Sequence, residues 1–265
     1  MHRTVESDGA RISYSIDGPS DAPALVLSNS IGTTRDLWAR QAPALTCVFR
    51  VIRYDTRGHG DSGVPAGDYT LDQLGRDVIA ILDQEGIATA HVCGLSLGGL
   101  TAMWLGVHEP ERVSSLVLAN TGARLRDMEF WNERIALVQS KGMGALAERA
   151  VTAWFSDVFR ERDPDTVHAF KAMLQDCDPQ GYIGCCAALR DADMRTAIAA
   201  IRCPTLVIGG TADTATPLAL AEFMRDRIPG AQLVTLDAAH LSNVEQADAF
   251  TDAMMEFLAT QSAVL

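Results

Sequence analysis

The sequence predicts an α/β fold in which a mostly parallel, doubly wound sheet carries an inserted helical cap. Three observations indicate this fold: short apolar runs typical of buried strands, segments of helical spacing between them, and one long interval where the alternation stops. Alternating strands and helices form a parallel sheet with right-handed crossovers. A length of 265 residues suits one large core with an inserted subdomain.

The strand candidates differ in the spacing of their apolar residues. Residues 11–16 alternate polar and apolar side chains, so we expect an edge strand with one face in water. The other candidates are mostly continuous apolar runs, which suit strands covered on both faces. They are residues 24–28, 48–52, 91–93, 113–118, 205–208 and 232–236. Apolar residues at helical spacing predict helices over 71–82, 97–107, 221–227 and 244–258.

The alternation stops between residues 121 and 199. This interval contains helical pieces at 130–138, 145–155 and 166–174, separated by Gly and Pro, and no clear strand. We therefore expect residues 1–120 and 200–265 to form the sheet core, with residues 121–199 inserted as a helical cap.

Composition and charge exclude several classes of function. The chain is 48% hydrophobic and 21% charged, as expected of a folded globular protein. Acidic residues outnumber Lys and Arg by 34 to 22, which gives a net charge of −12. This charge repels phosphate backbones and argues against nucleic-acid binding. It also means that local arginines must hold any substrate that carries a carboxylate.

The first residues and the cysteines predict a cytoplasmic protein. The first residues lack the basic segment and apolar run of a secretory signal. The most apolar stretch, residues 97–107, is too short for a membrane span and is interrupted by glycines. Six cysteines show neither a Cys-x-x-Cys pair nor zinc spacing. We expect reduced, buried thiols, no metal site and a monomer or homodimer.

A Gly-x-Ser-x-Gly motif lies at residues 94–98, between the strand candidate at 91–93 and the helix predicted for 97–107. In a nucleophile elbow the serine occupies a strained strand-to-helix turn, and small neighbours let strand and helix approach. The pattern alone arises by chance in about one such chain in ten. Its position after a strand and before a helix makes Ser96 the candidate nucleophile.

A serine hydroxyl needs an adjacent base to take its proton. In folds with this elbow an acid and then a histidine follow the serine along the chain. His108 falls in the helix after the elbow, and His168 lies among the predicted cap helices. His240 follows the last strand candidate, at the sheet edge where such sites form. His240 is therefore the predicted general base.

The acid should lie in the loop after the preceding strand. Asp213 is the only carboxylate within residues 209–217, although Asp is also a common N-cap of helices. Some related folds place the acid one strand earlier, where this chain has Asn120. Asp237 is close to His240 in the chain, too close to orient its ring easily. Asp213 is the predicted acid.

The negative oxygen of an acyl-transfer intermediate needs two backbone N–H donors. One should come from Leu97, the residue after the nucleophile. The loop at residues 28–32 should supply the other, and we expect the amide of Ile31. Both assignments use the main chain and leave the side chains free to vary.

With these residues placed, the chain resembles the 3-oxoadipate enol-lactone hydrolases, α/β-hydrolases of bacterial aromatic catabolism. The resemblance spans nearly the whole chain and rests on residues 29–34, 53–60, 93–99, 103–106, 184–191 and 239–245. The Arg-Gly-His-Gly of residues 57–60 is widespread among α/β-hydrolases and supports only the fold. Many α/β-hydrolases have His-Gly where this chain has Asn29-Ser30, and the enol-lactone hydrolases often have Met where this chain has Leu97.

The resemblance implies a small lactone with a carboxymethyl group as the substrate, an acyl-enzyme on Ser96, and no metal or organic cofactor. The free carboxylate would need an arginine of the cap. Arg134 and Arg190 are the first candidates, followed by Arg124, Arg126 and Arg149. Trp131 and Trp154 are candidates for the pocket wall, although aromatics at helical spacing also serve as core.

Other functions keep the same triad. A general carboxylesterase, a perhydrolase or a hydrolase of carbon–carbon bonds would differ only in the pocket, which the triad does not describe. A ligand-binding protein derived from a hydrolase is a further alternative, against which the intact Ser-Asp-His set argues.

Overall fold

The computed structural model describes residues 2–262, and its centre is one eight-stranded sheet in the order β1-β2-β4-β3-β5-β6-β7-β8. The pairs β1–β2 and β2–β4 are antiparallel, and all other neighbours are parallel. The predicted α/β class with a mostly parallel sheet is confirmed. The strands are β1 (His2–Ser7), β2 (Ala10–Asp17), β3 (Ala24–Ser28), β4 (Arg50–Tyr54), β5 (Ala90–Leu95), β6 (Val113–Ala119), β7 (Thr205–Gly210) and β8 (Gln232–Leu236).

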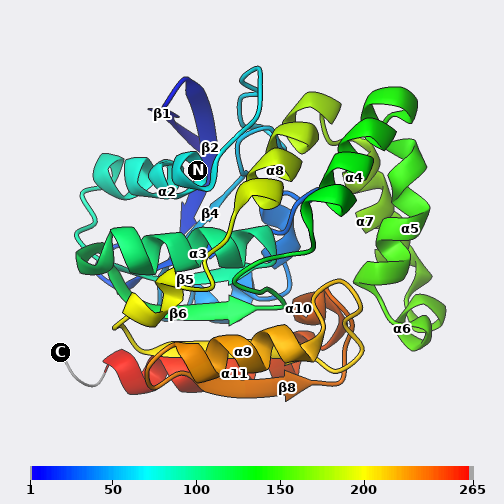
Figure 1. Ribbon diagram of the computed structural model, residues 1–265. Helices are drawn as coiled ribbons and strands as arrows, with labels where there is room; N and C mark the ends of the chain where they lie inside the picture. The colour runs from blue at the N-terminus through cyan, green and yellow to red at the C-terminus, as the bar shows by residue number, and fades with distance from the viewer. Residues whose placement is uncertain (1, 263–265) are drawn as a thin grey trace.

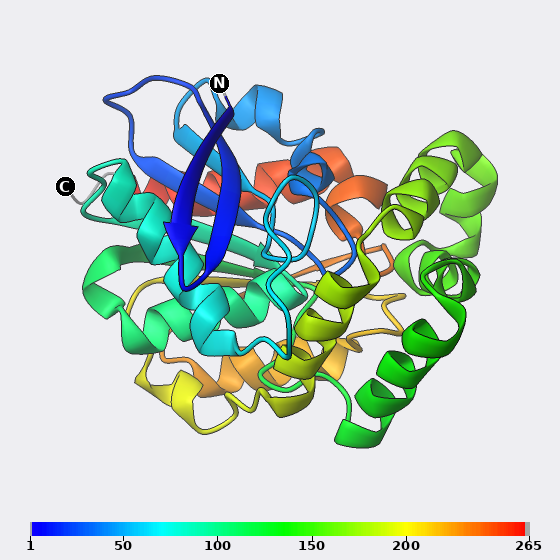
Figure 2. The ribbon, with the colours of Figure 1, turned by 90° about the horizontal axis from the view of Figure 1, so that it is seen from above.

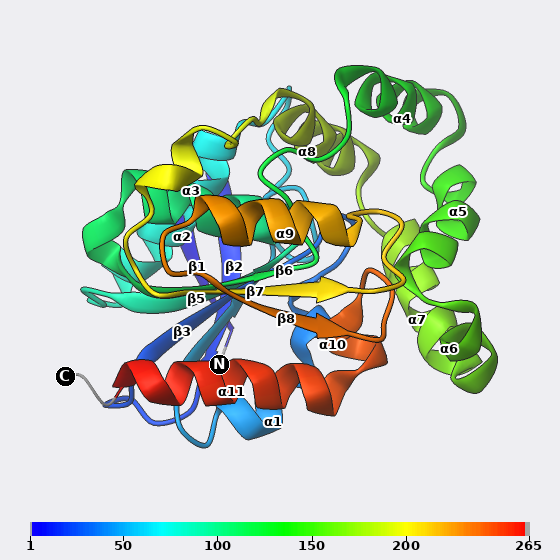
Figure 3. The ribbon, with the colours of Figure 1, turned by 60° about the horizontal axis from the view of Figure 1, so that its bottom comes forward.

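Helices cover both faces of the sheet. Figure 3 shows α2, α3 and α9 on one face, and α1 and α11 on the other. The α-helices are α1 (Ala42–Leu45), α2 (Leu71–Gln84), α3 (Leu97–His108), α4 (Met128–Lys141), α5 (Gly144–Trp154), α6 (Asp157–Arg162), α7 (Pro164–Gln175), α8 (Pro179–Asp191), α9 (Leu218–Arg227), α10 (Ser242–Glu245) and α11 (Ala247–Ser262). Three short 3-10 helices are η1 (Arg35–Trp38), η2 (Pro110–Arg112) and η3 (Ala197–Ala200).

The two ends of the sheet differ from the prediction. Residues 11–16 were expected at an edge, but β1 pairs outside β2 and takes that place. β1 has the sequence HRTVES with mostly exposed side chains, so it carries no apolar pattern that predicts a strand. At the other end, β8 is an edge strand with several exposed positions rather than a strand covered on both faces.

The helix predicted for residues 244–258 is also wrong as a single element. The chain forms α10, leaves helical geometry at Gln246 with φ −123°, and starts again as α11. Apolar spacing continues across this break because both helices pack on the same core. The break matters for function because α10 begins two residues after His240.

Five α-helices, α4–α8, and the short η3 connect β6 to β7, and no strand occurs between those two strands in the described chain. We call α4–α8 the cap helices. Figures 1 and 2 show α4–α7 beyond the end of the sheet where the parallel strands finish, and α8 running back from them towards the core. The division into a core and an inserted cap over residues 121–199 stays a prediction about domains.

Close packing explains why α8 was not predicted. The Gly and Pro residues that separate the predicted cap helices include Gly181, yet Gly181 lies in the first turn of α8. A Cβ there would lie 2.1 Å from the main-chain oxygen of Gly58, so only glycine allows the helix to approach the core this closely. No helix within residues 2–262 is long and apolar enough to cross a membrane.

Candidate active site

Ser96 lies on a strained turn between β5 and α3. Its backbone angles are φ 58° and ψ −113°, a region that L-residues rarely occupy and that is typical of functional sites. Three donors hold its main-chain oxygen: the amides of Gly99 (2.9 Å) and Leu100 (3.2 Å), and Thr121 Oγ1 (2.7 Å). These contacts stabilise the turn that the elbow motif predicts.

Two glycines of the motif are required by contact. A Cβ on Gly94 would lie 2.0 Å from the oxygen of Gly98, and a Cβ on Gly98 would lie 2.2 Å from the oxygen of Ser28. The amide of Gly98 also donates to the oxygen of Asn29 at 2.9 Å. The motif therefore brings the start of α3 against the loop after β3.

His240 and Asp213 are hydrogen-bonded to each other, as a triad requires. The distance from His240 Nδ1 to Asp213 Oδ2 is 2.9 Å, and both side chains are buried. The loops that carry them are joined by two main-chain bonds: Thr211 N donates to Leu236 O (2.9 Å) and Ala212 N to Ala238 O (3.0 Å). The loops after β7 and β8 thus hold the acid and the base in register.

The surroundings of Asp213 keep it ionised. Burial raises the pKa of its carboxyl group, but the charge on His240 and hydrogen bonds from His240 and Thr216 outweigh that effect and lower it to about 2. Oδ1 accepts from the amides of Ala215 and Thr216, each at 2.8 Å. A carboxylate that accepts several hydrogen bonds is expected to have a low pKa.

The alternative residues lie elsewhere. Asp237 is exposed and accepts from Thr211 Oγ1 at 3.3 Å. His108 ends α3 and packs on Trp104 with ring centroids 4.9 Å apart. His168 is exposed on α7. None of these three residues lines the pocket that holds Ser96 and His240.

Asn120 is part of the site, although sequence reasoning used it only to exclude an acid at that position. Its Nδ2 donates to Asp213 Oδ2 (3.0 Å) and to Ala239 O (3.2 Å), while Ser242 Oγ donates to its Oδ1. Its φ of 42° places it in the left-handed region. Asn120 therefore connects the acid to the main chain beside His240.

The two predicted oxyanion donors are available. Within residues 2–262 the amides of Ile31 and Leu97 have no hydrogen-bond acceptor, although both residues are buried. Leu97 is the first residue of α3, a 12-residue helix, and the N-terminus of a helix favours negative charge. Two amides without an acceptor next to the candidate nucleophile are the groups that an oxyanion hole requires.

His59 holds the loop that presents Ile31, and the sequence reading missed this role. The amide of Gly32 donates to His59 Nε2 at 2.9 Å, and Nδ1 lies 3.2 Å from Arg57 O. Burial lowers the pKa of His59 to about 4, so Nε2 is an acceptor at neutral pH. The only available sequence signal was the Arg-Gly-His-Gly segment, which indicated the fold alone.

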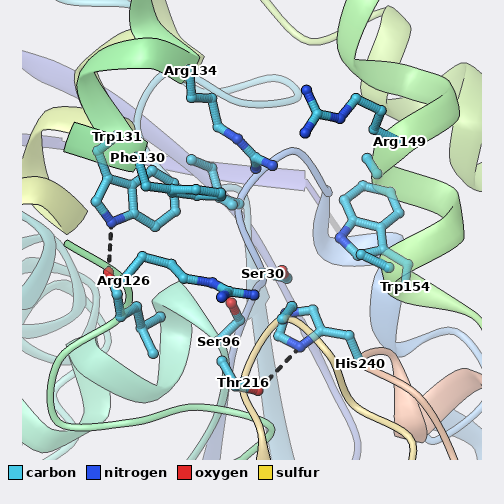
Figure 4. Close-up of a pocket in the computed structure, with 15 residues that line it drawn as sticks. Ser30, Ser96, Arg126, Phe130, Trp131, Arg134, Arg149, Trp154, Thr216 and His240 are labelled. Atoms are coloured by element: carbon cyan, nitrogen blue, oxygen red, sulfur yellow. Dashed lines mark hydrogen bonds between the residues drawn. The ribbon is translucent and has the colours of Figure 1, made fainter. Parts of the chain in front are cut away.

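Ser96, His240 and Ile31 line a pocket of about 190 Å³. Its volume is below the roughly 300–1,000 Å³ of sites for drug-sized ligands, which indicates a small substrate. Figure 4 shows Trp131 and Trp154 on opposite sides of it, from α4 and α5. Both predicted tryptophans thus line the pocket. Ser30 also lines it, and its buried hydroxyl has no partner within the described residues.

Three arginines line the same pocket: Arg126, Arg134 and Arg149. Within residues 2–262 none of them lies within 4.0 Å of a carboxylate oxygen, whereas most other arginines do. Arg134 stacks on Phe130, with Cζ 4.9 Å from the ring centroid, and donates to the hydroxyl of Tyr182 at 3.1 Å. Arg126 donates to Thr214 O and has a left-handed φ of 60°.

The predictions for Arg190 and Arg124 are corrected by this arrangement. Arg190, near the end of α8, does not line the pocket and pairs with Asp68 at 3.1 Å and Asp191 at 2.8 Å. Arg124 pairs with Asp193 at 3.4 Å. Both guanidinium groups already have carboxylate partners outside the pocket, so neither is placed to receive a substrate. No group of three or more His, Cys, Asp or Glu among the described residues is arranged to hold a metal ion.

Comparisons with known proteins identify the family of the chain. A family model described as alpha/beta hydrolase fold matches residues 23–247. Two curated relatives from Acinetobacter baylyi are named 3-oxoadipate enol-lactonase 2 and 3-oxoadipate enol-lactonase 1. They are 41% and 42% identical and cover 95% and 94% of this chain, and the matches span 94% of each relative. The crystal structure of an enol-lactonase from Burkholderia xenovorans superposes with a TM-score of 0.95 at 41% identity, covering 97% of this chain and 100% of that one.

Proposed function

Because the chain belongs to the α/β-hydrolase family, we propose that Ser96, Asp213 and His240 open the ring of 3-oxoadipate enol-lactone to give 3-oxoadipate. The chain is a carboxylic-ester hydrolase, because the relatives that it matches over nearly its whole length are enol-lactonases. The observation that carries the substrate class is the pocket, where three arginines without acidic partners surround Ser96 and His240. A pocket of this charge and size suits a small ester with a free carboxylate.

The first step forms an acyl-enzyme. Ser96 Oγ adds to the lactone carbonyl carbon while its proton passes to His240, whose Nδ1 is held by Asp213. The amides of Ile31 and Leu97 donate to the carbonyl oxygen as it becomes negative. When the intermediate collapses, the bond between the carbonyl carbon and the ring oxygen breaks. That oxygen leaves as an enolate and takes the proton from His240, and the enol becomes a ketone.

The second step releases the product. His240 takes a proton from water, whose oxygen adds to the ester carbonyl of the acyl-enzyme. Collapse of this second intermediate breaks the bond to Ser96 Oγ, which recovers its proton from His240. The product carries two carboxylates, one from the substrate and one newly formed. Apart from the substrate and water, every group in this sequence belongs to the chain.

We assign the substrate carboxylate to Arg134, with Arg149 opposite it. Figure 4 shows the guanidinium groups of these two residues directed towards the same opening, above Trp131 and Trp154. Stacking on Phe130 and the bond to Tyr182 fix the position of Arg134, so it loses little side-chain freedom when it binds a carboxylate. Arg126 extends from the other side of the pocket.

The experiment is to mix the purified protein with 3-oxoadipate enol-lactone and to follow its ultraviolet absorbance, beside a panel of uncharged esters. We expect the lactone to be turned over with the highest kcat/KM of the panel. Turnover of the simple esters without turnover of the lactone would overturn the substrate assignment. Slow binding of the lactone with no turnover of any compound would favour a ligand-binding protein.

Arg134→Gln and Arg190→Gln form a matched pair for the carboxylate assignment. A charge-assisted hydrogen bond contributes about 1.5–3 kcal/mol, so Arg134→Gln should lower kcat/KM for the lactone about 10-fold to 100-fold. The same variant should leave an uncharged ester nearly unaffected, and Arg190→Gln should affect neither substrate. Equal losses on both substrates would show that Arg134 does not recognise the carboxylate.

We also propose that the enzyme acts in the cytoplasm in the breakdown of aromatic compounds, as a monomer or homodimer. The six cysteines support a reducing compartment because all of them are free thiols. The pathway rests on the named activity of the relatives.

A further inference from the structure

Glu245 is a buried carboxylate that the proposed mechanism does not use. It is the last residue of α10, five residues after His240, and it is only 6% exposed. No Lys, Arg or His within residues 2–262 lies within 4.0 Å of its carboxylate oxygens; Arg162, which is near, donates to its main-chain oxygen instead, at 3.1 Å. A buried carboxylate without a cation costs stability unless hydrogen bonds satisfy it, so its partners indicate what it does.

Those partners come from both the core and the cap. Glu245 Oε2 accepts from the amide of Ala239 at 3.2 Å and from the amide of Ser156 at 3.2 Å, and Oε1 accepts from Ser156 Oγ. Ala239 directly precedes His240, while Ser156 is the N-cap of α6 in the cap. One oxygen atom therefore joins the main chain beside the general base to the main chain of the cap.

A second bond joins the same two segments on the other side of His240. The amide of Leu241 donates to the oxygen of Trp154 at 2.9 Å. Trp154 is the last residue of α5, and it lines the pocket together with Ala150 and Ala153 of that helix. Ala239 is thus linked to Ser156 through Glu245, and Leu241 is bonded directly to Trp154.

We propose that Glu245 is a positioning residue, whose carboxylate sets the general base His240 and the pocket wall formed by α5 in a fixed relation. This inference rests on the proposed function of His240. Glu245 does not line the pocket and acts only through its neighbours. Coupling of this kind makes the orientation of the base depend on the position of the cap.

Glu245→Gln tests the proposal because it keeps the size of the side chain and replaces one acceptor oxygen with a donor. The two main-chain amides can only donate, and Ser156 Oγ already accepts from the amide of Phe159 at 3.2 Å. The uncharged Gln therefore makes weaker bonds to these groups than the carboxylate does. A displacement of about 1 Å in a catalytic group can lower the rate about 100-fold. We expect kcat to fall about 10-fold to 100-fold on the lactone and on an uncharged ester alike, because both substrates use His240.

Three variants serve as controls. Glu256→Gln removes the same charge from an exposed position of α11 and should leave kcat unchanged. Ser156→Ala removes one donor to Glu245 and should lower kcat in the same direction as Glu245→Gln. Ser156→Thr keeps both the hydroxyl and the N-cap of α6 and should restore activity to near the wild-type value. The double variant Ser156→Ala with Glu245→Gln should lose less than the product of the two single losses.

A second readout does not depend on the substrate. The proton shared by His240 Nδ1 and Asp213 Oδ2 should give a low-field NMR resonance, which we expect to shift or broaden in Glu245→Gln and to stay in place in Glu256→Gln. A folded Glu245→Gln protein with wild-type kcat and an unchanged resonance would overturn the proposal. If that variant does not fold, equal activities of Ser156→Ala and Ser156→Thr would overturn it. A failure of the lactone assay with a shifted resonance would instead count against the proposed substrate alone.

Discussion

His59 shows how one buried side chain prepares the site. The unsatisfied amide of Ile31 lies in a loop whose next amide, that of Gly32, donates to His59 Nε2. This bond requires a neutral imidazole, and burial keeps the ring neutral by lowering its pKa to about 4. The same residue therefore links the geometry of the oxyanion loop to the stability of the protein in acid.

We predict that His59 makes the protein less stable as the pH falls below neutrality. The unfolded chain binds a proton at His59 near pH 6.5, whereas the folded chain does so only near pH 4, so protonation favours unfolding throughout that window. Between pH 7 and pH 5 this group should cost about 2 kcal/mol in the free energy of unfolding. Urea unfolding at both pH values measures it.

His59→Gln is the control, since its amide oxygen can still accept from Gly32 and it does not titrate. The loss of stability between pH 7 and pH 5 should be smaller in this variant by about 2 kcal/mol. An equal loss in both proteins would mean that His59 does not hold a depressed pKa.

Asn120 and Glu245 explain why part of the site could not be predicted. The nucleophile lies in a sequence motif, and the acid and the base could be predicted because each follows one of the last two strands. Asn120 and Glu245 act through bonds to residues distant in sequence, Asp213 and Ala239 for Asn120 and Ser156 for Glu245, and no spacing rule relates them. Such partners become visible only when the loops after β6, β7 and β8 are placed side by side.

The strand β5, the turn at Ser96 and the helix α3 form a unit whose packing depends on glycine. We predict that Gly98→Ala separates α3 from the loop after β3, because the added Cβ would lie 2.2 Å from Ser28 O. Overpacking of this kind costs on the order of 1–3 kcal/mol. It should also lower kcat/KM more than tenfold, since Ile31 and Leu97 lie on the two sides of that contact.

Gly144→Ala is the matched control within the cap. No atom lies within 4 Å of a Cβ built on Gly144, and its φ is not in the left-handed region. Alanine is the better helix former, so stability should stay the same or rise by up to about 1 kcal/mol. Thermal unfolding and ester kinetics of the two variants distinguish the packing effect from a general sensitivity of glycine positions.

Elements with apolar spacing were predictable, and those held by other forces were not. The buried strands and α2, α3 and α9 follow from periodicity. β1 has mostly exposed side chains, and α6 is only six residues long, so neither carries a pattern of its own. The pairing of Arg190 with Asp68 and Asp191 could not be predicted either, because it depends on how α8 packs against the loop before α2.

The whole molecule shares one hydrophobic core. Trp38 of η1 and Trp104 of α3, like Trp131 and Trp154 of the cap helices, are buried in the same continuous cluster. The chain as a whole carries a net charge of −12, so the three arginines without acidic partners make the pocket a local exception. Recognition of an anionic substrate is thus expected at short range rather than by long-range attraction.

A shared core predicts that the cap does not unfold on its own. We expect a single cooperative transition, with coincident curves from far-ultraviolet circular dichroism and from tryptophan fluorescence. Two double variants make the comparison sharpest. Trp131→Phe with Trp154→Phe keeps the tryptophans that pack near the sheet, and its fluorescence reports on that part. Trp38→Phe with Trp104→Phe keeps the two tryptophans of the cap helices, and its fluorescence reports on the cap. If the fluorescence of the cap tryptophans changed at a lower denaturant concentration than the circular dichroism of the same protein, a shared core would be contradicted.

Ser96 is proposed to attack a lactone, and every atom of the opened ring then stays on the acyl group bound to Ser96. The most direct measurement is intact-protein mass spectrometry after rapid acid quenching of the protein with 3-oxoadipate enol-lactone, followed by peptide mapping. We predict an adduct with the full mass of the lactone on Ser96, because the leaving oxygen stays tethered to the acyl group. Ser96→Ala should be folded, carry no adduct and have lost its activity. An adduct on another residue, or wild-type turnover by Ser96→Ala, would contradict the account.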